Sequence, residues 1–415
     1  MLWPMPKDPD SLRQAEIALE VAKKLFDAGY PTYLIGGVVR DSLLDIPTTD
    51  VDICTACPAD ELRKLLPEAE PWGKPKYSIF RIDSDLGDIE IARFREEKQC
   101  DGRHCSVELV DELSLDLRRR DFTVNALAVD PRNLEIIDEF GGMADLSRRL
   151  LRTIGDPGVR FVEDRLRMLR AIRFAAKLSF ALEDVTCCAL CHEARGIKQL
   201  SGDRIRLETG RILTGRNPGR GVHLLRISGL WEHIFPERAD DPVAPGWDRK
   251  IAILDRAVKG DFPDAAIWSL VLLPESAPSE QDLMSTANIL DRLDFSKADR
   301  RSIMSICKGI MLAARFSELP SAKAVELADS EELELVRALV YLRNPKNSFE
   351  TELARRFPYL EKEPTLTGND LSAALEGLSG AEISPIMNSL REAELSGRVT
   401  SPEEARDFIR ARKRK

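Results

Sequence analysis

The pattern of hydrophobic and polar positions divides this 415-residue chain into two kinds of segment. Over residues 11–29, apolar side chains recur at helical spacing and predict one amphipathic helix that ends near Gly29. Short apolar runs bounded by turn-forming residues then predict strands in YPTYLIGG, SIFRID, GDIEIARF, TVNALAVD and EIIDEFGG. The predicted strands therefore lie before about residue 142.

After Ala144, nearly every segment has helical character, and the breaks contain glycine and proline, as in GDPG, TGRNPGR and APGW. This order of elements predicts an α+β chain, in which an N-terminal domain with a small sheet precedes an elongated all-helical region. A chain of this length is too long for one ordinary core. We expect four domains, over residues 1–145, 146–225, 226–340 and 341–415.

Composition places the chain among globular proteins, with 43% hydrophobic and 32% charged residues. No apolar run approaches the length of a membrane span. The N-terminus also lacks the basic segment and apolar core of a signal peptide. We therefore expect a cytoplasmic protein that does not act in a membrane.

Charge is unevenly distributed along the chain. The formal net charge is −9, yet residues 146–220 hold sixteen Lys and Arg against eight Asp and Glu, a local +8 that leaves −17 for the rest. A basic stretch within an acidic protein is a candidate binding surface for a polyanion. Charge alone leaves open the alternative that these residues only form solvated helix faces.

The eight cysteines do not form a disulfide framework in a chain this long. Two spacings are compatible with zinc: Cys54-x-x-Cys57, and Cys188-x-x-Cys191 followed by His192. The second group lies in a predicted helix, where cysteine behaves as a small apolar residue. We therefore interpret both groups as structural.

A glycine pair follows the first predicted strand, in the segment LIGGVVRDSLLDIPTTDVDI. Gly36 and Gly37 have no side chains, so a phosphate can approach their backbone N–H groups closely. The residues after them can begin a helix whose N-terminus favours anions, and Arg40 adds positive charge. A simple turn is the alternative interpretation of the glycines.

The same segment ends in two carboxylates one residue apart. In a strand, Asp50 and Asp52 would point to the same face and repel one another unless a cation lies between them. Mg²⁺, which prefers oxygen ligands, is the natural candidate. Glu90, in another predicted strand, is a third carboxylate that could reach the same catalytic site.

Five segments in order resemble motifs of the class II tRNA nucleotidyltransferase and poly(A) polymerase family, which belongs to the polymerase-beta superfamily. They are LIGGVVRDSLLDIPTTDVDI, DLRRRDFTVNALAVD, GGMADLSRRLLRTIGDP, FVEDRLRMLRAIRFAAKLSF and ISGDRIRLE. The resemblance implies a polymerase-beta-like head domain, then a helical neck, body and tail. It also implies that the glycines contact a triphosphate and that Asp50 and Asp52 bind catalytic metals.

The later motifs imply roles in nucleotide selection. By resemblance, Arg120, Asp121 and Asn125 belong to a ribose-recognition motif, while Asp164 and Arg167 read the incoming base. On one helix, an acceptor and a donor three residues apart would share a face and could imitate the edge of a base. An ordinary surface salt bridge is the alternative for that spacing.

Two further arginines continue the fourth motif. Arg170 and Arg173 follow Arg167 at helical spacing and extend a basic ridge that could reach phosphates.

The activity implied by the resemblance is template-independent addition of CCA, or part of it, to the 3′ end of tRNA from CTP and ATP. A full-length loop within residues 95–119, near Asp101, disfavours addition of CC alone. Residues 366–405 resemble the tRNA-contacting tail of bacterial members that add CCA. Addition of the terminal A alone, poly(A) synthesis, a non-catalytic RNA-binding role and nucleotidyl transfer to a small molecule remain alternatives.

Overall fold

The computed structural model of the chain describes residues 1–48, 50–98, 106–238, 247–376 and 378–413. The chain forms two compact units, Met1–Pro236 and Glu237–Lys415. The finer division into four domains stays a prediction. The predicted loop near Asp101 lies outside the described residues.

The first unit is built on a seven-stranded mixed sheet with the order β3-β4-β5-β2-β1-β8-β9. Its strands are β1 (Thr32–Ile35), β2 (Val51–Thr55), β3 (Glu70–Trp72), β4 (Ile79–Ser84), β5 (Gly87–Arg93), β8 (Ala128–Val129) and β9 (Ile136–Ile137). A separate hairpin pairs β6 (Arg95–Lys98) with β7 (Ser106–Leu109). The predicted α+β class is confirmed.

The sheet register brings the carboxylate strands together. β2 and β5 are parallel neighbours, and Asp52 lies directly beside Glu90. β1 is antiparallel to β2, which places Ile35, the residue before the glycine pair, beside Asp52. The glycine pair, the two aspartates and Glu90 of the GDIEIARF segment are therefore brought together on or next to three neighbouring strands, β1, β2 and β5.

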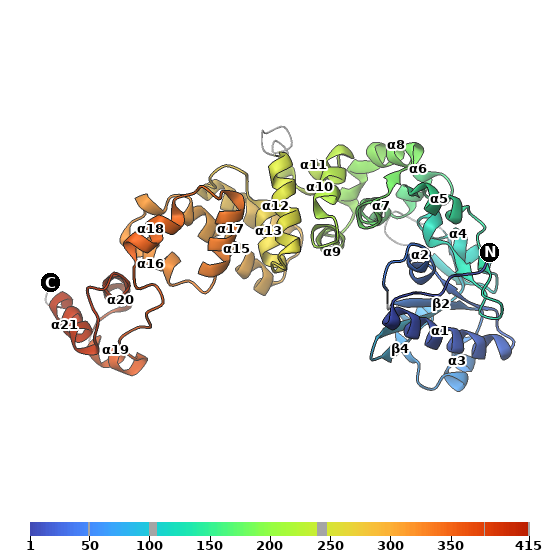
Figure 1. Cartoon of the computed structure of the whole chain (residues 1–415), viewed down its shortest axis with the longest axis horizontal. Coiled ribbons are helices and arrows are strands. Elements are labelled where there is room, and N and C mark those ends of the chain that lie inside the picture. Colours follow the sequence, from blue (N-terminus) through green and yellow to red (C-terminus); the bar gives the residue numbers. More distant parts are fainter. Residues whose placement is uncertain (49, 99–105, 239–246, 377, 414–415) are drawn as a thin grey trace. The chain divides into compact units, whose positions relative to one another are not determined.

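Helices surround this sheet and continue beyond it (Figure 1). Helix α1 (Pro9–Asp27) agrees with the helix predicted over 11–29, begins at an Asp8 cap and packs against β1 and β2. The other α-helices of the first unit are α2 (Gly37–Leu43), α3 (Ala59–Leu65), α4 (Leu113–Arg118), α5 (Gly142–Arg148), α6 (Pro157–Glu163), α7 (Leu166–Leu178), α8 (Asp184–Glu193), α9 (Gly202–Leu213), α10 (Pro218–Ile227) and α11 (Leu230–Ile234).

One detail of the predicted pattern was wrong, and one predicted strand is shorter than expected. The region after Ala144 is mostly helical rather than all-helical, because β10 (Leu150–Leu151) pairs in parallel with β11 (Ala181–Leu182). In TVNALAVD, a 3₁₀ turn, η2 (Thr123–Asn125), comes before the two-residue strand β8. Strands this short do not produce a periodic signal, so only pairing between distant segments defines them.

In the described residues of the second unit, every regular element is a helix. The α-helices are α12 (Trp247–Lys259), α13 (Asp264–Leu272), α14 (Glu280–Arg292), α15 (Lys297–Ala313), α16 (Ser321–Ala328), α17 (Leu333–Arg343), α18 (Phe349–Arg356), α19 (Gly368–Ala374), α20 (Gly380–Leu395) and α21 (Pro402–Lys413). The last three enclose an apolar cluster that includes Leu366, Leu390 and Ile409. Across the described residues of both units, helices long and apolar enough to cross a membrane are absent.

Candidate active site

A cavity of about 680 Å³ opens in the first unit. All the residues predicted for the site line it: Gly36, Gly37, Arg40, Asp50, Asp52, Glu90, Arg120, Asp121, Asn125, Asp164, Arg167, Arg170 and Arg173. They come from the glycine turn and α2, from β2 and the residue before it, from β5, from residues 120–125, and from α7 and the segment before it. The tertiary structure therefore gathers residues that are up to 137 positions apart in the chain.

Carboxylates form one wall of this cavity. Asp50 comes just before β2, Asp52 lies on β2, and Glu90 lies beside it on β5. Loss of solvation within the cavity raises the pKa of Asp52, and the charge of Asp50 acts in the same direction. Burial and the charge of Asp52 likewise raise the pKa of Glu90. The negative charge on this wall is therefore incompletely compensated by the protein.

Within the described parts of the chain, no three His, Cys, Asp or Glu side chains form a metal-binding group. The neighbouring carboxylates of Asp50 and Asp52 nevertheless offer the hard oxygen atoms that a divalent cation prefers. Because a nearby cation would favour their charged forms, these residues fit such an ion.

The glycine turn brings the backbone close to the carboxylate wall. Gly36 has φ 71°, and a Cβ atom there would lie 3.3 Å from Arg120 Nη1 and 3.5 Å from Asp52 Oδ2. Only glycine combines this backbone conformation with so close an approach. The N–H of Gly36 donates to the Leu127 carbonyl at 3.0 Å, so it serves the fold. Gly37 begins α2, where backbone N–H groups have no partner within the helix.

A chain of polar contacts connects the glycine helix to α7. Arg40 is buried and donates from Nε to Asp41 at 2.7 Å and from Nη1 to the side-chain oxygen of Asn125. Asn125 in turn donates to Asp121 at 3.0 Å, and Arg170 donates to the other Asp121 oxygen at 2.7 Å. Burial alone would raise the pKa of Asp121, but Arg170 and Asn125 lower it to about 2. Much of Arg40, predicted to hold phosphate, is therefore engaged within the protein.

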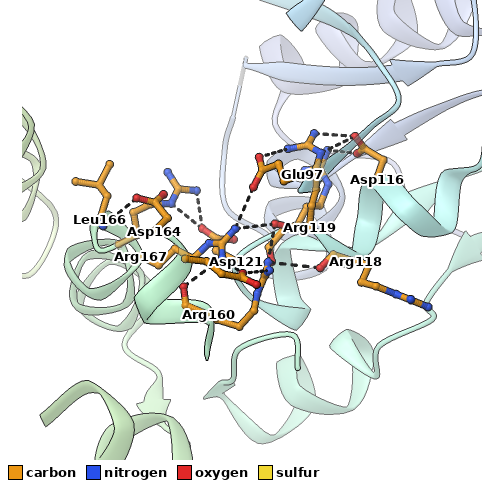
Figure 2. A network of polar contacts seen from close by, with 12 residues as sticks. Glu97, Asp116, Arg118, Arg119, Asp121, Arg160, Asp164, Leu166 and Arg167 are labelled. Atoms are coloured by element: carbon orange, nitrogen blue, oxygen red, sulfur yellow. Dashed lines mark hydrogen bonds and ion pairs between the residues drawn. The ribbon is translucent and has the colours of Figure 1, made fainter. Parts of the chain in front are cut away.

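The base-selection pair does not lie on one continuous helix, so that part of the prediction was wrong. Asp164 has an extended backbone between α6 and α7, and its side chain accepts from the Leu166 N–H at 3.1 Å. No ion pair joins it to Arg167 in the described structure. Arg167 instead pairs with Glu163 at 3.0 Å and with Glu97 at 3.3 Å. Figure 2 shows the contact between Arg167 and Glu97. Asp164 and Arg167 still line the same cavity.

Three residues of this network were missed in the sequence: Glu97, Asp116 and Arg160 (Figure 2). Arg160 donates from Nη2 to the carbonyls of Arg119 and Arg120, both at 2.7 Å, which satisfies the C-terminal end of α4. For Asp116, the i,i+3 and i,i+4 spacing in DLRRR was an available signal. The contacts of Arg160 with the Arg119 and Arg120 carbonyls span 41 and 40 residues, and Glu97 pairs with Arg119 and Arg167 across 22 and 70 residues. Contacts over such separations leave no local signal.

The predicted basic ridge packs around an aromatic ring. Arg40, Arg170 and Arg173 place their guanidinium carbons 5.2, 5.4 and 4.4 Å from the centre of the Phe174 ring. Arg173 also pairs with Glu208 at 2.8 Å. These contacts preorganise the basic wall of the cavity before any phosphate is bound.

The cysteine groups lie apart from this cavity. Cys54 and Cys57 are buried free thiols, and burial raises the pKa of Cys57 to about 11. Cys187, Cys188 and Cys191 are free thiols on α8.

Two family models match the chain: the poly A polymerase head domain over residues 32–152, and a probable RNA- and SrmB-binding site of polymerase A over residues 179–241. A CCA-adding enzyme of Levilactobacillus brevis is 36% identical over 258 residues, which are 62% of this chain and 63% of the relative. One of Bacillus cytotoxicus is 28% identical over 396 residues, 93% of this chain and 95% of the relative. Over these segments the chain is similar to the tRNA nucleotidyltransferase and poly(A) polymerase family.

The family resemblance extends to solved structures. The Bacillus stearothermophilus CCA-adding enzyme in complex with CTP has a TM-score of 0.69 and 26% identity, covering 97% of this chain and 98% of that one. In the alignments at 34–37% identity, by contrast, the chain spans only 54–65% of the relatives' own lengths. The similarity to this nucleotidyltransferase family implies use of a divalent metal.

Proposed function

We propose that this protein adds CCA, or part of it, to the 3′ end of tRNA from CTP and ATP, without a nucleic-acid template. One observation carries the proposal: a single cavity combines a carboxylate wall, a glycine turn and the Asp164–Arg167 segment. The first two suit a metal-bound triphosphate, and the third suits a base. The names of the relatives described above agree with this activity.

The metal we propose is Mg²⁺, held by Asp50 and Asp52. When bound, it would activate the tRNA 3′-hydroxyl and stabilise the charge of the triphosphate and the leaving pyrophosphate. Glu90 would add negative charge beside these ligands. The raised pKa of Asp52 supports the assignment, because a cation would relieve the unfavourable charge there.

The remaining residues would orient the nucleotide. The space left by Gly36 and the first N–H groups of α2 would receive phosphates, with Arg120 beside them. Asp121 and Asn125 would position the sugar. These two side chains already hydrogen-bond to one another, so little reorganisation would be needed on binding.

Base selection would fall to Asp164 and Arg167. Arg167 is held from two sides by Glu97 and Glu163, which restricts the directions of its remaining donors. A site built to pair with specific base edges rejects other bases, because mismatched polar groups stay unpaired. Arg170 and Arg173 would add positive charge near the phosphates.

The tRNA would be bound by its backbone and shape, through the basic helices between residues 146 and 220 and the tail over residues 341–415. The proposed cytoplasmic location follows from this substrate.

The test uses purified full-length protein, labelled CTP or ATP, Mg²⁺ and tRNAs that lack three, two or one of the terminal nucleotides. CCA addition predicts C incorporation on the two shorter tRNAs and A incorporation on the longest. Incorporation of A only, on the longest tRNA, would instead identify an A-adding enzyme. Long A tracts would identify a poly(A) polymerase, and tRNA binding without incorporation would leave a non-catalytic RNA-binding protein.

A further inference from the structure

Asp116 lies behind the cavity wall and is almost completely buried. Its Oδ1 accepts from Arg119 Nε and Nη2 at 2.9 and 2.7 Å and from the backbone N–H of Arg95 at 3.2 Å. Its Oδ2 accepts from Arg120 Nη2 at 3.2 Å. Burial would raise the pKa of Asp116, but Arg120 and Arg119 lower it overall, so this carboxylate is charged. Figure 2 shows Asp116 paired with Arg119.

Arg120 lies between this buried carboxylate and the carboxylate wall. Its Nη2 pairs with Asp116, while its Nη1 and Asp52 Oδ2 flank the same glycine, Gly36. Among the described residues, Asp116 is its only ion-pair partner. Its Nε is also buried without a hydrogen-bond partner in the described structure. Asp52 is therefore close to a guanidinium that another carboxylate holds in place.

The charge balance at this point has a direct consequence for cation binding. A guanidinium that formed a two-pronged pair with Asp52 would occupy the carboxylate oxygens that a metal needs. It would also place a positive charge against the incoming ion. A metal site at Asp52 therefore requires a second acceptor that holds the Arg120 guanidinium near the proposed triphosphate site but apart from Asp52.

We propose that Asp116 is a positioning residue that holds Arg120 away from Asp52 and so leaves Asp52 available to a divalent cation. Asp116 does not line the cavity and would touch neither the metal nor the nucleotide. The inference deepens the proposed function, on which it rests for the purpose of the metal. Metal binding itself can be measured without nucleotide or tRNA.

The experiment measures Mn²⁺ binding to the full-length protein from the electron paramagnetic resonance signal of free Mn²⁺. Asp116→Asn keeps the shape of the side chain and removes its charge, so Arg120 is free to pair with Asp52. We expect the Mn²⁺ dissociation constant to rise about tenfold, because the positive charge of Arg120 would then lie next to the cation and repel it. Asp52→Asn should abolish this binding and identifies the site that is being measured.

The decisive variant is the double substitution Asp116→Asn with Arg120→Gln. Removal of the cation should restore Mn²⁺ binding to the wild-type level or tighter, even though Asp116 is still absent. A general structural role for Asp116 predicts the opposite, because the double variant removes still more of the network. The control is Asp130→Asn, which breaks the ion pair between the buried Asp130 and the exposed Arg132, 2.6 Å apart, elsewhere in the same unit.

Wild-type Mn²⁺ affinity in Asp116→Asn would overturn the inference, and so would a double variant that binds as weakly as Asp116→Asn. If Asp116→Asn does not fold, Arg120→Gln alone decides: binding weaker than wild type contradicts the inference, and equal or tighter binding supports it. Failure of the proposed function is separate, since it would appear as a wild-type protein that binds Mn²⁺ in this pattern but incorporates no nucleotide.

Discussion

Two cavities of the same volume, about 680 Å³, show how different two concave sites in one protein can be. The first is the charged cavity of the first unit. The second lies in the second unit, between α16 and α20, and is lined by Leu366, Met387 and Leu390 as well as charged residues. Volume therefore does not identify the reactive site.

The charges differ in how they are compensated. In the second cavity, Glu394 accepts from the Thr365 N–H at 2.9 Å and pairs with Arg391 at 3.4 Å, while Arg391 also pairs with Asp329 at 2.8 Å. In the first cavity, desolvation and then the charge of Asp50 raise the pKa of Asp52, and desolvation and then the charge of Asp52 raise the pKa of Glu90. Charge that the protein itself leaves uncompensated marks the cavity built for a charged ligand.

The largest expected effect comes from Asp52. Asp52→Ala should lower the rate of nucleotide incorporation by about a thousandfold or more, because several kcal/mol of metal-mediated stabilisation would be lost. Binding of tRNA, measured by filter retention, should stay close to wild type. If the purified variant incorporated labelled ATP at the wild-type rate, the first cavity could not be the reactive site.

Arg167→Ala should change selection rather than metal binding. We expect discrimination between correct and incorrect triphosphates to fall roughly 10- to 100-fold, the size of effect that loss of specific pairing groups produces. Competition among the four triphosphates on one tRNA measures it, with the exposed Arg148→Ala as control. Unchanged discrimination among the four triphosphates would show that Arg167 does not select the base.

A charged residue of the second cavity should affect stability and not chemistry. Glu394→Ala leaves the Thr365 N–H without its acceptor and removes one partner of Arg391, which should lower the free energy of unfolding by about 2 kcal/mol. Chemical denaturation measures this loss, and the exposed Glu363→Ala is the control. If Glu394→Ala lowered the single-turnover rate of incorporation in folded protein, the second cavity would have a catalytic role.

The smallest effects compare two carboxylates of the first cavity in metal-free protein. The pKa of Asp121 is about 2, below its ordinary 3.8, so its charge stabilises the fold above pH 4 and that contribution is lost as the pH falls towards 2. Asp121→Asn should therefore cost roughly 2 kcal/mol at pH 7 and less at pH 3.

Asp52 should behave in the opposite way. Because its folded pKa is raised, its favourable contribution is present below the ordinary pKa and is lost as the pH rises through the folded value. Asp52→Asn should then stabilise metal-free protein at pH 7 and have little effect near pH 3. Urea unfolding at pH 7 and pH 3 measures the free energy of unfolding of both variants. If Asp121→Asn and Asp52→Asn changed this free energy at pH 7 in the same direction, the opposite pKa shifts of the two carboxylates would be contradicted.

Several features of the fold could be predicted from local patterns. The helix α1 has a clear period, and the strands around Leu34 and Ile91 are short apolar runs. The order of the motifs also placed Gly36 and Asp52 in one site, because only sixteen positions separate them. The β10–β11 pair and the break between α6 and α7 could not be predicted in this way, since neither has a repeating signal.

What the sequence by itself determined was the chemistry available: a glycine turn, paired aspartates, and the acidic and basic residues of the later motifs. Only the tertiary structure decided which of those groups are already engaged. Arg40 is tied to Asn125, Arg167 to Glu97, and Arg120 to Asp116. Charge compensation depends on distance and burial, and these are set by packing between segments far apart in the chain.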